Sequence, residues 1–235
     1  MIGLSKVKEF RKPEANCLAS YILEMLTAIP VETLTPSFET LPVDPYLKAG
    51  YRFRRLSHFK VEGDRLIKLP HRRMFQSKSY NSLLGDVIRE YEELDDSLIE
   101  LEAFQQLIWE FFQFAQLCST STEIAVHQIR ITASSDQAGN PAPEGIHRDG
   151  VDLVGIFSVN RQKIEGAETH LYQSKNDAPV FSKVLSPGEF LVFRDDQFFH
   201  FTSSVQPTTS EQGVRDVFVL TSPGLFPPDD EHSDR

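Results

Sequence analysis

Residues 124–131 read IAVHQIRI, a stretch in which the side chains alternate in character along the chain. A two-residue period places successive side chains on opposite faces and indicates a β-strand. Five further short segments with strand character follow, separated by turns that contain glycine, proline and serine. They span residues 151–159, 169–172, 180–185, 189–194 and 214–221. Several short strands at this spacing predict a sandwich or jelly-roll.

The chain before residue 121 has a different period. Apolar residues recur at three- and four-residue spacing over residues 15–26, and again over residues 96–118, which carry a wide apolar stripe. Such a period predicts amphipathic helices, and the second stripe suits a helix that packs against a sheet. We therefore expect a mainly β protein with a helical N-terminal half, in which residues 1–120 buttress a jelly-roll core of residues 121–222. A single domain would span residues 1–226.

Charge and composition restrict the possible partners. The chain has 34 acidic and 24 basic residues, a formal net charge of −10. An acidic surface repels phosphate backbones and anionic membranes, so we expect neither nucleic acid nor membrane as a partner. The acidic segment 227–235 is expected to be a disordered tail. The two distant cysteines, and the lack of an apolar N-terminal segment, favour a cytoplasmic protein, as a monomer or homodimer.

The most informative motif is EGIHRDG, residues 144–150. His147 and Asp149 are two residues apart, so their side chains leave an extended chain on the same face. An imidazole and a carboxylate side by side supply two of the three ligands of the facial triad of non-haem iron(II) oxygenases. Glycines on both sides of the pair, Gly145 and Gly150, allow tight turns.

A third ligand and an anion-binding residue follow downstream. His200 lies 53 residues after His147, just beyond the predicted strand 189–194. Arg215 lies a further 15 residues on, and in a strand it shares a face with Val217 and Val219. A buried arginine requires an anionic partner, and a 2-oxoglutarate carboxylate would accept two parallel hydrogen bonds from it. The sequence thus predicts His147, Asp149 and His200 as catalytic metal ligands and Arg215 as the cosubstrate anchor.

This order of HxD, distant histidine and arginine resembles the iron(II)/2-oxoglutarate dioxygenases. More narrowly, several segments resemble the small bacterial family of isoleucine and leucine hydroxylases that act on free L-amino acids. These are EGIHRDG (144–150), VDLVGIFSV (151–159), EGAETHLY (165–172), SPGEFLVF (186–193), YRFRRLSHF (51–59) and FQSKSYNSLLGDVIREY (75–91). The resemblance covers residues 50–222 and implies a double-stranded β-helix of the cupin-like type, with Fe(II), 2-oxoglutarate and O2 as cofactors.

One position departs from the wider superfamily. Many of its members have serine or threonine two residues after the anchoring arginine, where this chain has Val217. We therefore expect Gln128, Arg130 or Tyr172 to help hold the distal carboxylate.

The resemblance implies hydroxylation of a free aliphatic amino acid such as leucine, isoleucine or methionine, with release of succinate and CO2. A zwitterionic substrate needs one binding group of each charge. Glu144, Arg148 and Asp152 surround the metal motif and are the candidates. The arginines at 52, 54 and 55 could form a solvated face, a lid contact or a clamp for the substrate carboxylate. His127 and His170 lie in predicted strands and suit structural roles better than ligation.

Other classes of protein share parts of this pattern. A cupin-like metal enzyme that does not use 2-oxoglutarate would not need Arg215 in its interior. A dioxygenase acting on a peptide or carrier-bound substrate would need an open groove. A non-catalytic binding domain would tolerate the loss of a ligand, whereas this chain has all three.

Overall fold

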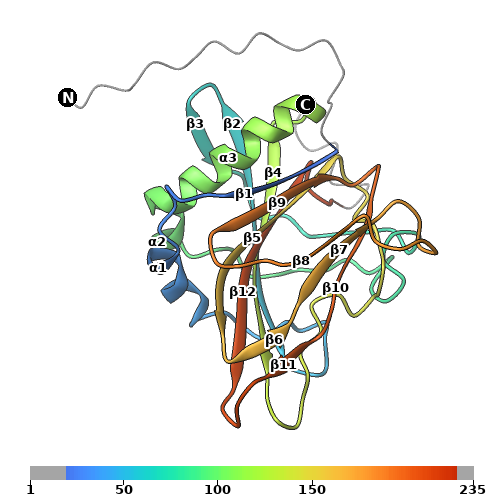
Figure 1. The fold of residues 1–235 in the computed structure, drawn as a ribbon. Coiled ribbons are helices and arrows are strands. Elements are labelled where there is room, and N and C mark those ends of the chain that lie inside the picture. The colour runs from blue at the N-terminus through green and yellow to red at the C-terminus, as the bar shows by residue number, and fades with distance from the viewer. Residues whose placement is uncertain (1–19, 227–235) are drawn as a thin grey trace.

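The computed structural model describes residues 20–226, and it is built mainly of antiparallel strands (Figure 1). The main sheet has seven strands in the order β1-β9-β5-β12-β4-β2-β3. Their bounds are β1 Tyr21–Met25, β2 Arg52–Glu62, β3 Arg65–Lys68, β4 Glu123–Ala133, β5 Leu153–Gln162, β9 Glu189–Arg194 and β12 Gly213–Ser222. The expected mainly β architecture is therefore confirmed.

Two smaller sheets complete the strand framework. A three-stranded sheet has the order β10-β7-β8, and a two-stranded sheet pairs β11 with β6. Their bounds are β6 Ile164–Gly166, β7 Glu168–Tyr172, β8 Phe181–Val184, β10 Phe199–Thr202 and β11 Val205–Pro207. Leu171 of β7 is fully buried in one apolar cluster with Ile156 and Leu191 of the main sheet, so the three-stranded sheet packs on the inner face of the main sheet. All six strands predicted from the sequence are present.

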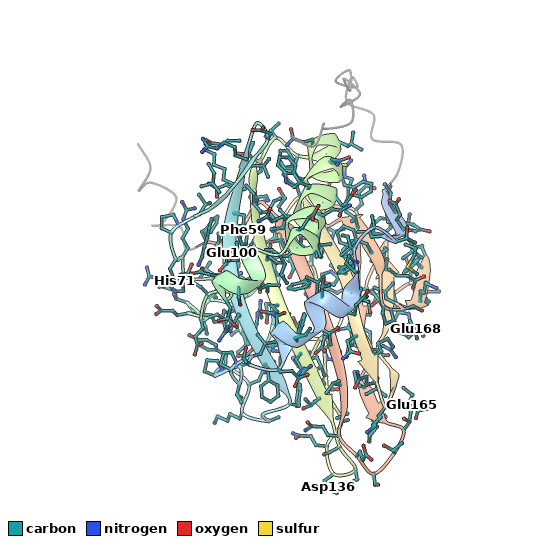
Figure 2. All side chains as sticks on the ribbon, turned by 90° about the vertical axis from the view of Figure 1, so that its left-hand side faces the viewer. Phe59, His71, Glu100, Asp136, Glu165 and Glu168 are labelled. Atoms are coloured by element: carbon teal, nitrogen blue, oxygen red, sulfur yellow. The ribbon has the colours of Figure 1, made fainter. Side chains whose placement is uncertain are left out.

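The helices cover the other, outer face of the main sheet, as Figures 1 and 2 show from two sides. They are α1 Val31–Leu34, the 3-10 helix η1 Thr35–Phe38, α2 Asp96–Ile99 and α3 Glu102–Cys118. Phe104 of α3 contacts Phe59 of β2 and Phe218 of β12, with ring centroids 5.8 and 5.5 Å apart. The apolar stripe of α3 is therefore core, as predicted.

The expectation of a helical N-terminal half is wrong. The predicted helix 15–26 begins outside the described residues, and its described part forms β1, which pairs with β9 at the edge of the main sheet. Residues 52–68 form the hairpin β2–β3. The predicted helix 96–118 is interrupted at Leu101, which has an extended backbone. Pairing with distant strands has overridden the local helical pattern, which is common for short segments. The predicted tail, residues 227–235, also lies outside the described residues.

The two faces of strand β4 meet different parts of the molecule. Its even-numbered residues Ile124 and Val126 are buried in the cluster beneath the helices. Its odd-numbered residues His127, Ile129 and Ile131 line a cavity on the inner face, between the main sheet and the three-stranded sheet. The parity of a residue on the central strands therefore decides whether its side chain can reach the cavity. Within residues 20–226, no helix has the length and hydropathy needed to cross a membrane.

Candidate active site

His147, Asp149 and His200 come together at one end of the cavity. The first two lie in the loop between β4 and β5, and His200 lies on β10. Reciprocal backbone hydrogen bonds join the loop to the strand: His147 N donates to His200 O at 3.0 Å, and His200 N donates to His147 O at 2.8 Å. This pairing carries the two histidine rings to a centroid separation of 4.1 Å.

The side chains of these three residues converge on one point. The Nε2 atoms of His147 and His200 lie 3.8 and 3.7 Å from the two carboxylate oxygens of Asp149. One ligand atom from each residue lies within 4.8 Å of the other two. The group therefore presents two imidazole nitrogens and one carboxylate to a shared centre.

The protonation of these groups suits a divalent metal. Nδ1 of His147 lies 2.9 Å from the carbonyl oxygen of Gly145, so it carries the proton and leaves the Nε2 lone pair free. Burial holds the pKa of His200 well below its usual value, so this imidazole is neutral. Two imidazoles and a carboxylate, with room for further ligands, form the donor set of the 2-His-1-carboxylate iron(II) oxygenases. The residues present thus fit Fe(II).

A second layer of side chains fixes Asp149. Gln76 donates from Nε2 to Asp149 Oδ1 at 2.8 Å, and Arg89 donates to Oε1 of the same Gln76 at 2.8 Å. The buried carboxylate of Asp195 accepts hydrogen bonds from the backbone N–H groups of Asp149, Gly150 and Val151. Burial, and then the charge of Asp149, raises the pKa of Asp195 to about 7.

Arg215 lies inside the cavity on β12, as its shared face with Val217 and Val219 predicted. Its side chain is buried, and among residues 20–226 no carboxylate forms an ion pair with it. Burial, and then the charge of Arg161, lowers its pKa to about 10, at which the guanidinium is still charged at neutral pH. A lone buried cation of this kind calls for an anionic ligand.

Gln128 and Arg130 point away from the cavity, which corrects the expectation that they contact a cosubstrate. Gln128 donates to Ser37 Oγ at 2.8 Å, and Arg130 pairs with Asp216 at 2.7 Å and with Glu39 at 2.9 Å. Both residues have even numbers on β4, so the pleat directs them to the outer face beneath the helices. Their contacts are those of residues that stabilise the fold.

Three other predicted residues also lie outside the cavity. Tyr172 is on β7 and is not among the residues that line the cavity. Arg148 donates to the Phe198 carbonyl oxygen at 3.3 Å and packs on the ring of Phe199, while Asp152 accepts a hydrogen bond from Ser119. Arg148 and Asp152 thus contact groups that do not line the cavity, which speaks against their expected role in substrate binding.

Glu144 does line the cavity, with its Oε1 3.4 Å from Nε2 of His147. Several lining residues come from segments distant in the sequence: Arg54 of β2, Gln76, Arg89 and Thr202 of β10. Of these, Arg54 was among the arginines that the sequence offered for the substrate carboxylate, whereas Gln76, Arg89 and Thr202 were assigned no role. The position of Thr202 could have been predicted from the sequence, because it follows His200 by two residues in a strand and therefore lies on the same face. His127 is buried with Nδ1 2.6 Å from Arg54, and His170 contacts Ser182, so neither belongs to the metal group.

A β-jelly-roll interior that holds two histidines and an aspartate around one point defines the class of mononuclear non-haem iron oxygenases. Comparison with known families agrees: the family model described as 2OG-Fe dioxygenase matches residues 35–221. The chain belongs to this family, whose cofactors are Fe(II), 2-oxoglutarate and O2.

Two curated relatives carry the names of enzymes that act on isoleucine or on a hydroxyisoleucine. The L-isoleucine-4-hydroxylase of Bacillus thuringiensis is 25% identical over 63% of this chain, and the chain spans 63% of that enzyme's length. The 3(1)-hydroxy-L-isoleucine 4-dioxygenase of Pantoea ananatis is 26% identical over 81% of this chain and 80% of its own length.

Solved structures share the fold. A bsmA homologue from Methylobium petroleophilum PM1 is 30% identical and superposes with a TM-score of 0.76, covering 88% of this chain and 90% of its own. The structure of IDO from Bacillus thuringiensis has a TM-score of 0.73 at 19% identity, covering 86% of this chain and 92% of its own.

Proposed function

We propose that this protein is an Fe(II)/2-oxoglutarate-dependent dioxygenase that hydroxylates a free aliphatic L-amino acid and releases succinate and CO2. The observation that carries the proposal is the combination of the His147–Asp149–His200 group with the buried Arg215, which has no ion-pair partner among the described residues, in one cavity. A cupin-like metal enzyme that does not use 2-oxoglutarate would gain nothing from a buried, unpaired guanidinium, whose desolvation is costly.

In this proposal Nε2 of His147, Nε2 of His200 and the Asp149 carboxylate hold the iron. When bound, iron(II) supplies the oxidative chemistry that couples decarboxylation of 2-oxoglutarate to hydroxylation of a substrate C–H bond. The protein orients the reactants and keeps water away.

Arg215 binds the distal carboxylate of 2-oxoglutarate, and Thr202 is the hydroxyl that can assist it. Thr202 is buried, lies on the His200 face of β10 and lines the same cavity as Arg215. Its Oγ1 is 3.2 Å from Thr169 Oγ1, which leaves it able to donate a further hydrogen bond while accepting from Thr169. A threonine on another strand thus compensates for the valine at position 217.

The substrate is proposed to be an amino acid on two grounds. Both curated relatives carry names of enzymes that act on isoleucine or its hydroxy derivative. Glu144 supplies a carboxylate beside the metal group for an ammonium, and apolar side chains of the cavity, Met74, Ile156 and Leu225 among them, suit an aliphatic chain. A cytoplasmic location and a monomeric or homodimeric state remain predictions.

The test measures succinate release with Fe(II) and 2-oxoglutarate across the twenty free amino acids. We expect leucine, isoleucine or methionine to give the largest increase over the background without substrate. N-acetylation of the best substrate should reduce its turnover strongly, because it removes the ammonium that Glu144 would bind. If the N-acetylated or a carrier-tethered form turns over as fast as the free amino acid, the substrate is a conjugated amino acid and the free-amino-acid proposal is wrong.

A further inference from the structure

Arg54 is a second buried arginine in the cavity. It lies on β2, where it pairs in register with Ile129 of β4, whereas Arg215 pairs with Ile131 on the opposite side of β4. The two guanidinium groups therefore belong to strands that flank β4, at levels two residues apart. They can serve two different ligands.

Within residues 20–226, Arg54 contacts uncharged groups. Its Nη2 lies 2.6 Å from His127 Nδ1 and 3.5 Å from the Met74 sulfur, and its guanidinium carbon lies 4.5 Å from the centre of the Tyr91 ring. Its Nε is buried and has no hydrogen-bond partner among the described residues.

His127 accepts the hydrogen bond from Arg54, because a guanidinium can only donate. Burial, and secondarily the charge of Arg54, holds the pKa of His127 well below its usual value. The imidazole is therefore neutral at physiological pH and orients the guanidinium without neutralising its charge.

Nearby carboxylates are already engaged. Asp44 accepts from Arg52 Nε at 2.7 Å and from the backbone N–H of Tyr46 at 2.9 Å. Among residues 20–226, no carboxylate forms an ion pair with Arg54. The neighbouring Arg89 donates from Nη2 to Gln76 at 2.8 Å, and its Nε, like that of Arg54, has no hydrogen-bond partner among the described residues. A buried guanidinium with an unused donor, at the wall of a cavity, requires an anion from outside the chain.

We propose that Arg54 binds the α-carboxylate of the substrate, an inference that rests on the proposed function because it takes the substrate to be a free amino acid. The ligand class is an α-amino acid whose ammonium lies towards Glu144 and whose carboxylate lies towards β2. Arg54 and Glu144 line the same cavity from different segments, so the two charges of a zwitterion meet complementary groups. Arg215 remains available for the cosubstrate.

The test compares binding of each amino acid with binding of its amide, which lacks the carboxylate charge. Equilibrium dialysis of the Fe(II)- and 2-oxoglutarate-loaded enzyme without oxygen would use leucine, isoleucine, methionine and the three corresponding amides. We expect the wild-type protein to bind its best amino acid at least about tenfold more tightly than the amide, as a charge-assisted bond implies. Arg54→Met should lower affinity for the amino acid at least about tenfold and leave affinity for the amide within about twofold.

Arg55→Met is the matched control. Arg55 is the next residue of β2, but it ion-pairs with Asp95 and Glu92 and does not line the cavity, so its loss should preserve the ratio of the two affinities. Arg54→Lys, which keeps a point charge, should give an intermediate ratio and provides a second variant if Arg54→Met does not fold.

Three outcomes would overturn the assignment of Arg54. The first is a wild-type protein that binds none of the six probes, or binds amide and amino acid equally. The second is an Arg54→Met variant that loses affinity for both to the same degree, as a purely structural role predicts. The third is an Arg54→Met variant in which the ratio of the affinities for amino acid and amide is unchanged and 2-oxoglutarate binds more weakly. If the ratio shifts as expected but no amino acid stimulates succinate release, the carboxylate site stands and the proposed hydroxylase function fails.

Discussion

Gln76 Nε2 lies 2.8 Å from Asp149 Oδ1, so an amide from the segment between β3 and α2 holds the carboxylate of the metal group. Arg89 fixes this amide by donating to its oxygen. Removing an outer partner of a metal ligand costs about 10–100-fold in metal affinity or activity. We expect Gln76→Ala to weaken Mn(II) binding, followed by electron paramagnetic resonance, by about that factor, while Ser79→Ala in the same segment has no effect. Unchanged binding in Gln76→Ala would mean that Asp149 is positioned by its backbone alone.

Replacing any one of His147, Asp149 and His200 by alanine should abolish succinate release. Each residue supplies one of three converging ligand atoms, so two remaining ligands would hold the metal weakly. Circular dichroism should show a folded protein in each case. Near-normal turnover in one variant would remove that residue from the ligand set.

Arg215→Ala should raise the Michaelis constant for 2-oxoglutarate at least about tenfold. The expected loss is that of a charge-assisted bidentate bond, roughly 1.5–3 kcal/mol, and each 1.4 kcal/mol changes affinity tenfold. Steady-state kinetics with varied 2-oxoglutarate provides the measurement. A folded variant with an unaltered constant would place the anchor elsewhere, with Thr202 and Arg161 as the next residues to replace.

Arg130→Met, in contrast to Arg215→Ala, should lower the stability of the fold and leave the Michaelis constant for 2-oxoglutarate unchanged. Arg130 faces the outer side of β4. Its loss would leave the fully buried carboxylate of Asp216 with the Asn160 amide as its one side-chain partner among the described residues. Breaking a buried ion pair at one end costs roughly 3–5 kcal/mol. Urea unfolding measures this loss. A stable variant with a raised Michaelis constant would return Arg130 to the cosubstrate site.

Stability of the metal-free protein should fall as the pH decreases below about 6.5. Burial, followed by the charges of Arg72 and His71, lowers the pKa of His58 to about 3, and its Nε2 has no hydrogen-bond partner. Between pH 6.5 and 3 the unfolded chain binds a proton at this position that the folded chain does not, so protonation favours unfolding. From pH 7.5 to 5.5 this single group accounts for about 1.4 kcal/mol.

Urea unfolding at the two pH values tests this contribution. The free energy of unfolding should differ between pH 7.5 and pH 5.5 by about 1.4 kcal/mol less in His58→Gln than in the wild-type protein. His170→Gln is the control, because that side chain lies on β7 and is not among the groups that lower the pKa of His58, whereas His71, labelled at the surface in Figure 2, is one of them. An unchanged pH dependence in His58→Gln would assign the effect to the other buried histidines.

The two-residue period of a β-strand was sufficient to predict several strands and site residues. The alternation in residues 124–131 and the spacing of HxD, His200 and Arg215 depend only on the pleat of single strands, which repeats every two residues. The alternation predicted the strands and the inward direction of Arg215, and the spacing predicted the metal group. The same rule, applied to β4, could also have shown that Gln128 and Arg130 share a face opposite to that of His127, but not which face was inner.

The sequence by itself thus determined the mainly β fold class, the residues of the metal group and the arginine beside them. Only the tertiary structure decided the rest. Five residues such as Tyr21–Met25 fit a helix or a strand, and pairing with β9 made the choice. The contacts of Arg54 and Gln76 join segments 73 residues apart in each case, to His127 and to Asp149. No local pattern encodes such contacts, because they arise when the hairpin β2–β3 and the segment after it pack against β4 and the metal loop.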